Sequence, residues 1–400
     1  MGAGEYRFRK GVAPGRRDLE SPPGSLRIET LNSAAPSVSV VIPTLNSARY
    51  LEECLGSVRA QEYAGRVEVV IVDGGSTDET LDIARRFEVE RILGNALKTG
   101  EAGKAVGLKA AEGDLLLSLD SDNVVVGSDW LRRMVEPFRD PDVMSAQALR
   151  WDYRRQDHFI TRWAALTGVG DPLALYVGNY DRYSHLTGRW TDYPHQAEQQ
   201  EGWLRVKIDP EWVPTIGANG YLVRRQALFR VPFGDYFFDI DFAHELVQLG
   251  LNTIALVDVP IRHYFSDSVS RFYLKTRRRV DDFYFFSSVG LRRYPWRSRK
   301  KRGVARFVAS TLLVVPLLVD ISRGFRRRPD RARAAGTSSS SAWNMVVSLT
   351  LAAVTAAVSG RPPPSQTRWS LLPGLPRSTG FAPTWSPHCD DLPVVVAARA

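Results

Sequence analysis

Two aspartates separated by one residue follow an apolar run in the N-terminal half of the chain. Residues 115–119 have the composition of a buried strand, and Asp120 and Asp122 come directly after it. Side-chain alternation along a strand would send both carboxylates to the same side at its carboxyl end. Ligands bind at that edge of open α/β sheets, and paired carboxylates suit a hard divalent cation that also holds phosphate oxygens. A turn in which these aspartates only cap the next helix fits the local sequence equally well.

A second pair, Asp239 and Asp241, lies in the aromatic run 236–242. Aromatic surroundings raise the pKa of a carboxyl group by desolvation, which is how a general base is tuned toward neutral pH. The alternative is that both aspartates cap the helix expected over 243–249. The local sequence leaves both interpretations open.

The elements before residue 125 must position the first pair. Residues 37–42 and 67–72 read as strands, and the second strand ends in a turn with two glycines, where Ser76 and Glu79 have the spacing of a capping box. The order strand, helix, strand, helix, strand predicts a mostly parallel α/β sheet with helices on both faces. No G-x-G-x-x-G follows the first strand and no P-loop motif occurs, which argues against nicotinamide chemistry and P-loop hydrolysis.

Composition places the chain among globular proteins with a regional positive charge. Its 400 residues are 44% apolar and 24% charged, and the net charge of +9 is concentrated in residues 275–279, 292–306 and 323–333. Such a patch implies an anionic partner. The two cysteines are far apart and form no CxxC, so neither a disulfide framework nor a zinc site is expected.

Three later features could belong to the same site. The loop 216–220 contains two glycines that allow a ligand to approach the backbone. His263 ends a late strand, and such a histidine is usually structural, although beside an acidic metal motif it can complete the coordination. Residues 151–212 mix aromatic and polar side chains, a composition that suits a sugar or lipid-phosphate pocket but more often reflects plain packing.

A basic helix over 272–280 precedes an apolar segment, 307–319, that is too short to span a bilayer and suits an interfacial helix. Residues 342–359 would make a poor span. The helix carries Lys275, Arg277, Arg278 and Arg279, which could hold an anionic lipid headgroup. We therefore expect a membrane surface as partner and a polyprenyl phosphate or lipid-linked saccharide as acceptor. The alternative is a solvated basic face and a soluble glycan acceptor.

Five motifs, taken together and in this order, resemble glycosyltransferase family 2, the inverting GT-A enzymes that use nucleotide-sugar donors. They occupy residues 41–46, 72–78, 120–122, 217–220 and 238–241. The resemblance implies a GT-A type fold and a divalent cation, Mn2+ or Mg2+. It also implies that Asp239 takes a proton from the acceptor while the cation stabilises the departing diphosphate.

The resemblance further assigns roles to individual residues. Donor contacts would come from Pro43, Thr44, Asn46, Asp73, Lys104, Asp120, Ser121 and Asp122, with Asp73 on the nucleotide base. The metal would be held by Asp120, Asp122 and His263. Acceptor contacts would come from Gly217, Ala218, Asn219 and Gly220, together with the four cations of the basic helix.

Three departures from the family pattern qualify these roles. Gly74 stands where the family often has a second aspartate, so the base contact could differ. Phe238 replaces the usual glutamate of the catalytic-base motif, which leaves Asp239 as the expected base and Asp241 as the second choice. No Q-x-x-R-W follows, which favours transfer of a single sugar over processive synthesis.

The expected organisation is a disordered leader over 1–36, a nucleotide-sugar-binding half over 37–125 and an acceptor and catalytic half over 126–290. Basic and apolar membrane-associating segments follow over 291–359, then a disordered tail over 360–400. The expected location is the cytoplasmic face of the cell membrane, with a role in cell-envelope glycan or polysaccharide synthesis. Two other classes stay open. A nucleotidyltransferase that makes or uses nucleotide sugars shares the nucleotide-binding sheet and the acidic metal site, but it would normally carry a glycine-rich basic loop after the first strand, where this chain has Pro-Thr-Leu-Asn. A nucleic-acid-binding protein would leave the Asp-Ser-Asp motif unexplained, so no nucleic acid partner is expected.

Overall fold

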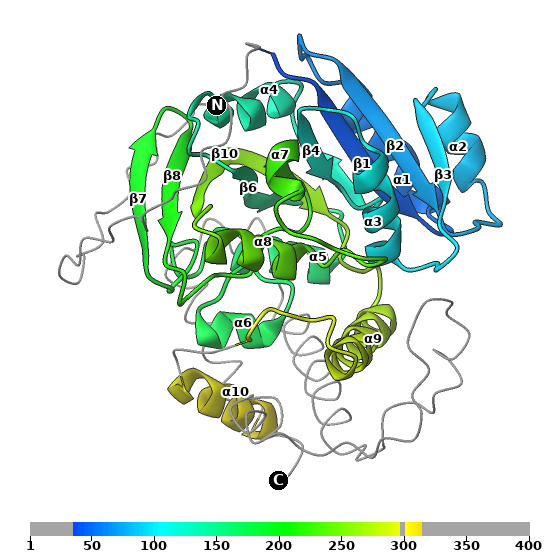
Figure 1. Ribbon diagram of the computed structural model, residues 1–400. Helices are drawn as coiled ribbons and strands as arrows, with labels where there is room; N and C mark the ends of the chain where they lie inside the picture. The colour runs from blue at the N-terminus through cyan, green and yellow to red at the C-terminus, as the bar shows by residue number, and fades with distance from the viewer. Residues whose placement is uncertain (1–34, 297–300, 314–400) are drawn as a thin grey trace.

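The computed structural model describes residues 35–296 and 301–313 (Figure 1). The strands are β1 (Val38–Thr44), β2 (Val67–Asp73), β3 (Arg91–Gly94), β4 (Leu115–Ser118), β5 (Asn123–Val125), β6 (Ser145–Asp152), β7 (His195–Gln200), β8 (Trp203–Ile208), β9 (Tyr221–Arg224) and β10 (Thr253–His263). The helices are α1 (Ala48–Arg59), α2 (Thr80–Arg86), α3 (Gly100–Ala110), α4 (Trp130–Val135), the 3-10 helix η1 (Glu136–Arg139), α5 (Phe159–Thr167), α6 (Pro172–Val177), α7 (Arg225–Leu228), α8 (Asp239–Gln248), α9 (Val269–Ser288) and α10 (Lys301–Leu313).

All ten strands join one sheet in the order β3-β2-β1-β4-β9-β6-β10-β8-β7, with β5 paired to β10. The strands β1 to β4 are parallel, as predicted for residues 37–125. The prediction of a mostly parallel sheet is wrong for the second half, where β9 runs antiparallel between β4 and β6. The β7–β8 pair is also antiparallel, because the two residues between these strands leave room only for a hairpin.

Helices cover both faces of the sheet, as predicted. On β1, Val40 and Ile42 belong to the apolar cluster that includes residues of α1, α2, α4 and α5. Val41 points the other way and packs in the cluster that includes α3, α7 and α8. The helix α3 lies very close to β1, since a Cβ on Gly107 would come within 2.3 Å of Val41 Cγ1. This sheet is the scaffold that presents the ends of β1, β2 and β4 to one site.

Several local predictions need correction. The capping box of Ser76 and Glu79 does not form, because Ser76 Oγ donates to Asp73 and α2 begins only at Thr80. The helix expected over 243–249 begins earlier, so Asp239 and Asp241 lie in the first turn of α8. The basic stretch and the aromatic residues after it form one continuous helix, α9.

Among residues 35–296 and 301–313, no helix is both long and apolar enough to cross a bilayer. The helix α10 covers the first part of the apolar segment predicted over 307–319. The second apolar segment, the predicted tail and residues 1–34 of the predicted leader lie outside the described residues.

Candidate active site

The loop after β2 is built around the carboxylate of Asp73. One of its oxygens accepts hydrogen bonds from Thr44 Oγ1 (2.9 Å) and Ser76 Oγ (2.5 Å), and the other from the backbone N–H groups of Gly75 and Ser76 (both 2.8 Å). Burial would raise the pKa of Asp73, but these hydrogen bonds outweigh it and lower the pKa. Asp73 is therefore ionised and shapes the loop with both oxygens.

Asn46, two residues after the end of β1, supports the same loop. It has a left-handed backbone (φ 50°), and its side-chain oxygen accepts from the N–H of Thr77 at 2.8 Å. Pro43 lies against α3, where a Cβ on Gly103 would come within 2.8 Å of Pro43 Cβ. The residues predicted to surround the nucleotide thus lie side by side at the ends of β1 and β2.

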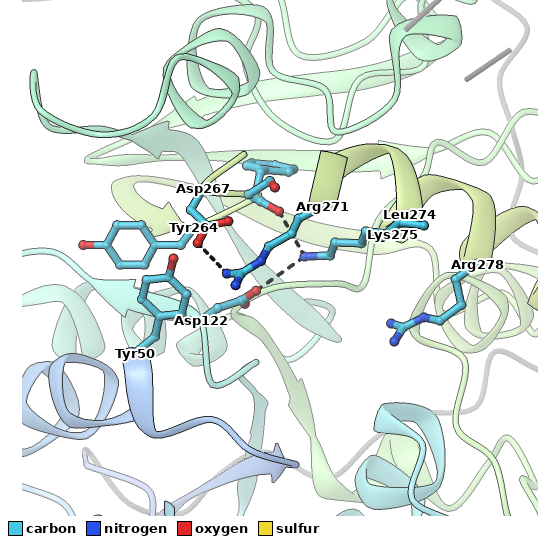
Figure 2. A pocket seen from close by; sticks show the side chains of 10 residues that line it. Tyr50, Asp122, Tyr264, Asp267, Arg271, Leu274, Lys275 and Arg278 are labelled. Carbon is cyan, nitrogen blue, oxygen red and sulfur yellow. Dashed lines mark hydrogen bonds and ion pairs between the residues drawn. The ribbon is translucent and has the colours of Figure 1, made fainter. Parts of the chain in front are cut away.

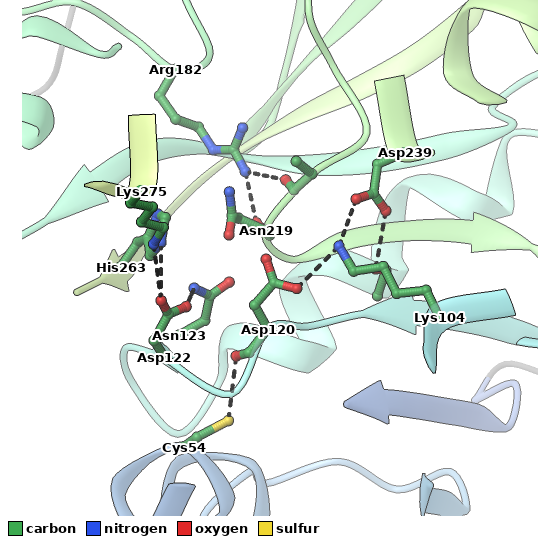
Figure 3. Close-up of polar contacts among 12 residues, drawn as sticks. Cys54, Lys104, Asp120, Asp122, Asn123, Arg182, Asn219, Asp239, His263 and Lys275 are labelled. Carbon is green, nitrogen blue, oxygen red and sulfur yellow. Dashed lines mark hydrogen bonds and ion pairs between the residues drawn. The ribbon is translucent and has the colours of Figure 1, made fainter. Parts of the chain in front are cut away.

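A buried lysine joins the two predicted aspartate motifs. Lys104 Nζ on α3 lies 3.0 Å from Asp120 Oδ1 and 2.6 Å from Asp239 Oδ2 (Figure 3). Asp239 Oδ1 also accepts from Ser118 Oγ at the end of β4 (3.2 Å). The Asp239 side chain is 13% exposed and that of Lys104 8%, so this ion pair is largely removed from water. The fold thus brings together a carboxylate of each motif, 119 positions apart in the sequence, through one cation.

Burial and the neighbouring charges both shift the pKa values of Lys104 and Asp239. Burial raises the pKa of Asp239 to about 6. The positive charge of Lys104 lowers this pKa, and the negative charge of Asp120 raises it. Burial lowers the pKa of Lys104, but the two carboxylates outweigh burial, so the pKa is raised and the ammonium stays charged. A carboxylate with a pKa near 6 is ionised at neutral pH and can still accept a proton, as a general base must.

The second motif aspartate, Asp122, belongs to a different cluster. Its Oδ2 lies 3.4 Å from His263 Nε2 and 3.5 Å from Lys275 Nζ, and Figure 3 shows this group on the side of Asp120 opposite Lys104. Burial would raise the pKa of Asp122, but Lys275 and, when protonated, His263 hold it well below its usual range. The prediction that Asp120 and Asp122 point the same way is wrong, because β4 ends at Ser118 and the chain turns through both residues.

The loop 217–220 fits tightly between these clusters. Gly217 has φ +112°, and a Cβ there would lie 2.4 Å from the carbonyl oxygen of Asp239. Arg182 Nη2 donates to the carbonyls of Ala218 (2.9 Å) and Asn219 (2.7 Å), and its guanidinium stacks 4.5 Å from the Trp151 ring. The loop is therefore fixed against the start of α8, which carries Asp239.

Comparison with known proteins identifies the family. Residues 39–197 match the family model described as Glycosyl transferase family 2. An N-acetylglucosaminyltransferase from Bradyrhizobium elkanii is 30% identical over 149 residues, which is 35% of this chain and 81% of that protein. The chain belongs to glycosyl transferase family 2.

Two further proteins resemble this family 2 chain over different extents. A PGL/p-HBAD biosynthesis glycosyltransferase from Mycobacterium tuberculosis is 42% identical over 106 residues, covering 25% of this chain and 41% of that protein. The chain thus matches about two fifths of the length of that relative. A mannosyltransferase from Pyrobaculum calidifontis, solved with GDP-Man and Mn2+, superposes with a TM-score of 0.47 at 17% identity, over 80% of this chain and 87% of that chain.

For the divalent cation that family 2 implies, the chain offers Asp122 and His263. Their carboxylate oxygen and imidazole nitrogen are 3.4 Å apart, and both atom types ligate Mn2+. Burial lowers the pKa of His263, which favours the neutral imidazole that binds metals. Within the described residues no group of three or more His, Cys, Asp or Glu could surround an ion, and Asp120 contacts Lys104 instead. The donors therefore fit a cation that takes its remaining ligands from a diphosphate.

Asp241, the second choice for the base, anchors the chain after α9. Its Oδ2 accepts from Arg292 Nε (3.0 Å) and Nη2 (2.7 Å), and its Oδ1 accepts from the backbone N–H groups of Arg293 and Tyr294. The side chain is 6% exposed. This carboxylate is committed to structural contacts, whereas that of Asp239 faces Lys104 and Ser118.

Replacing Asp241 by asparagine should lower stability rather than chemistry. The change removes the negative charge that pairs with Arg292 and leaves hydrogen-bond donors beside it without an acceptor. We expect this to lower the free energy of unfolding by about 3 kcal/mol. Urea denaturation would measure this loss, while turnover per folded molecule should stay within about twofold. A turnover loss larger than that of the matching Asp239 variant would reverse the two roles.

The four cations predicted on the basic helix divide into two groups. Lys275 and Arg278 line a pocket that also contains Asp122 (Figure 2). Arg277 and Arg279 are exposed and are not among the lining residues of that pocket. The predicted acceptor cluster is therefore split by the helix geometry.

Sequence reasoning missed three arginines with clear structural roles. Arg182 donates hydrogen bonds to the loop 217–220, and Arg292 pairs with Asp241. Arg271 lines the pocket that contains Asp122, Lys275 and Arg278. Only Arg271 had a usable signal, since it lies four residues before Lys275 and hence on the same helix face. Arg182 bonds mainly to backbone carbonyls, which leave no trace in the sequence.

Proposed function

We propose that this family 2 member transfers a single sugar from a nucleotide-sugar donor to an acceptor hydroxyl or phosphate, with inversion of the anomeric centre. The observation that carries the proposal is the buried Lys104–Asp239 pair, which abuts the end of β4 and the loop 217–220. A carboxylate with a raised pKa at this position suits proton abstraction from an attacking hydroxyl.

In this mechanism Asp239 accepts the hydroxyl proton through an oxygen atom as the acceptor attacks the face opposite the leaving diphosphate. Lys104 keeps that carboxylate ionised and oriented, and Ser118 fixes its second oxygen. Asp122 and His263 would hold the divalent cation, which supplies positive charge to the diphosphate as it departs. No covalent bond between sugar and protein is required in a single displacement.

The donor is tested by a thermal-shift screen across UDP-, GDP- and dTDP-sugars, with and without Mn2+. A donor present at 100 times its dissociation constant should stabilise the protein by about 2.7 kcal/mol. Asp122→Ala should remove the part of this shift that depends on Mn2+, because that carboxylate is the charged member of the expected cation site. If EDTA leaves turnover of a nucleotide sugar intact, the metal part of the proposal is wrong.

The acceptor that we propose is lipid-linked, a polyprenyl phosphate or a lipid-linked saccharide used in cell-envelope glycan synthesis. Support comes from the cationic helix α9, whose Lys275 reaches Asp122 and whose Arg277 and Arg278 are exposed. These cations would hold the chain at the cytoplasmic face of the membrane. The full chain should float with anionic liposomes at low salt and dissociate at high salt; failure to float at low salt would favour a soluble acceptor.

A further inference from the structure

A pocket of about 370 Å³ lies between the chain segment that follows β10 and the first half of α9 (Figure 2). Tyr50 and Tyr264 form one wall and are stacked, with ring centroids 4.7 Å apart. The helix contributes the opposite wall through Arg271, Leu274, Lys275 and Arg278. Asp122 lies at the pocket as well, so the pocket adjoins the expected cation site.

The pocket carries more positive than negative side chains. Three cations of α9 line it, against the two carboxylates Asp122 and Asp267. Arg271 contacts Asp267 at 2.5 Å, and Arg49 shares that carboxylate. Within the described residues, the ion pair of Arg278 is a longer contact, 3.8 Å to Asp282, and its side chain is 59% exposed. Its guanidinium therefore keeps donors available for an incoming anion.

An apolar residue lies among these cations. Leu274 is 60% exposed and lines the same pocket between Arg271 and Arg278. A phosphate bound by the two guanidiniums would leave an attached hydrocarbon chain close to Leu274. The mixture of charge and exposed apolar surface therefore fits an amphiphile better than a wholly polar ligand.

We propose that this pocket is an acceptor subsite that binds a phosphate group carried on an amphiphile, through Arg271, Lys275 and Arg278. The inference rests on the proposed transfer reaction and names the chemistry of its acceptor. The lining residues include none from β2 or from the loop 74–78, so the pocket is separate from the expected nucleotide end of the site. The donor and the phosphate-bearing acceptor can then occupy the protein together.

The helix supplies a matched control for this subsite. Arg277 and Arg278 are neighbours with similar exposure, 54% and 59%, and each lies near an aspartate four residues later, at 4.0 Å and 3.8 Å. Only Arg278 lines the pocket. Arg277→Gln and Arg278→Gln thus remove the same charge from the same helix, and differ in whether that charge faces the pocket.

The test is calorimetric titration of the full chain with decyl phosphate, below its micelle concentration, in the presence of Mn2+ and saturating UDP or GDP. Decyl phosphate should bind with either nucleotide already present, and decanol should bind at least about tenfold more weakly. Arg278→Gln should weaken decyl phosphate binding by about five- to tenfold, and Arg277→Gln by less than about twofold. Glycerol 3-phosphate, which carries the charge without the chain, should bind more weakly than decyl phosphate.

Three outcomes would overturn the inference. Equal losses in Arg277→Gln and Arg278→Gln would mean that general surface charge, rather than the pocket, attracts the ligand. Competition between decyl phosphate and the nucleotide would assign the pocket to the donor. Binding of glycerol 3-phosphate as tight as that of decyl phosphate would indicate a soluble phosphorylated acceptor. If neither nucleotide binds at all, the proposed transfer reaction fails, and the comparison of the two arginine variants still tests the pocket.

Discussion

Replacing Asp239 by asparagine should lower turnover by about a hundredfold or more while leaving fold and donor affinity unchanged. Asparagine keeps the shape of the side chain and can still accept a hydrogen bond from Lys104 Nζ, 2.6 Å away in the wild type. It cannot take up a proton at neutral pH. The loss should therefore appear in turnover rather than in the dissociation constant of the donor, measured by steady-state kinetics and by titration.

The pH dependence gives this prediction a second readout. The pKa of Asp239 is raised to about 6 by burial, with Lys104 lowering it and Asp120 and Glu101 raising it. Since the base acts as the carboxylate, kcat/KM should rise with pH through about 6 and level off above it. The Asp239→Asn variant should lack this rise. An unchanged pH profile in the variant, or a loss below about threefold, would remove Asp239 from the role of base.

Lys104→Met should impair both stability and turnover. Methionine leaves two partly buried carboxylates, Asp120 and Asp239, facing each other without the cation between them. We expect a loss of about 3 kcal/mol in the free energy of unfolding. Because the charge of Lys104 lowers the pKa of Asp239, its removal should move the rising limb of the pH profile upward, with about a tenfold loss of turnover at pH 7.

Lys109→Met is the matched control on the same helix. Lys109 is exposed, and its Nζ donates to the carbonyl of Gly234 (2.6 Å), so its removal should leave the pH profile unchanged. Lys104→Arg keeps the positive charge, so the folded variant should retain the rising limb of the wild-type pH profile. A Lys104→Met variant with a wild-type pH profile would show that the ammonium does not control the base.

The sequence was most informative where structure is local. The strands β1, β2 and β4 are mostly apolar, as expected for buried parallel strands, because both of their faces are covered. The family resemblance placed Asp239 ahead of Asp241 as the base, an assignment that stays a prediction. The contacts of the two carboxylates, Asp241 with Arg292 and Asp239 with Lys104, come from partners far along the chain and not from the local sequence.

Other features depend on distant pairing, which has no local signal. The insertion of β9 between β4 and β6 pairs it with segments that lie between 74 and 109 positions earlier in the sequence. Asp120 and Asp122 point apart because β4 ends at Ser118. The apolar pattern predicts a strand that ends one residue later. The ion pair of Lys104 with Asp239 required the whole sheet to be assembled, so no spacing rule could have predicted it.

The most direct measurement is NMR of the first sugar product released from a nucleotide-sugar donor by the wild-type chain, with Mn2+ present. We expect nucleoside diphosphate to be released from at least one donor and the new anomeric configuration to be opposite to that of the donor, with Asp239→Asn releasing about a hundredfold less in the same time. Retention of the anomeric configuration, or equal release by wild type and Asp239→Asn, would contradict the proposed mechanism.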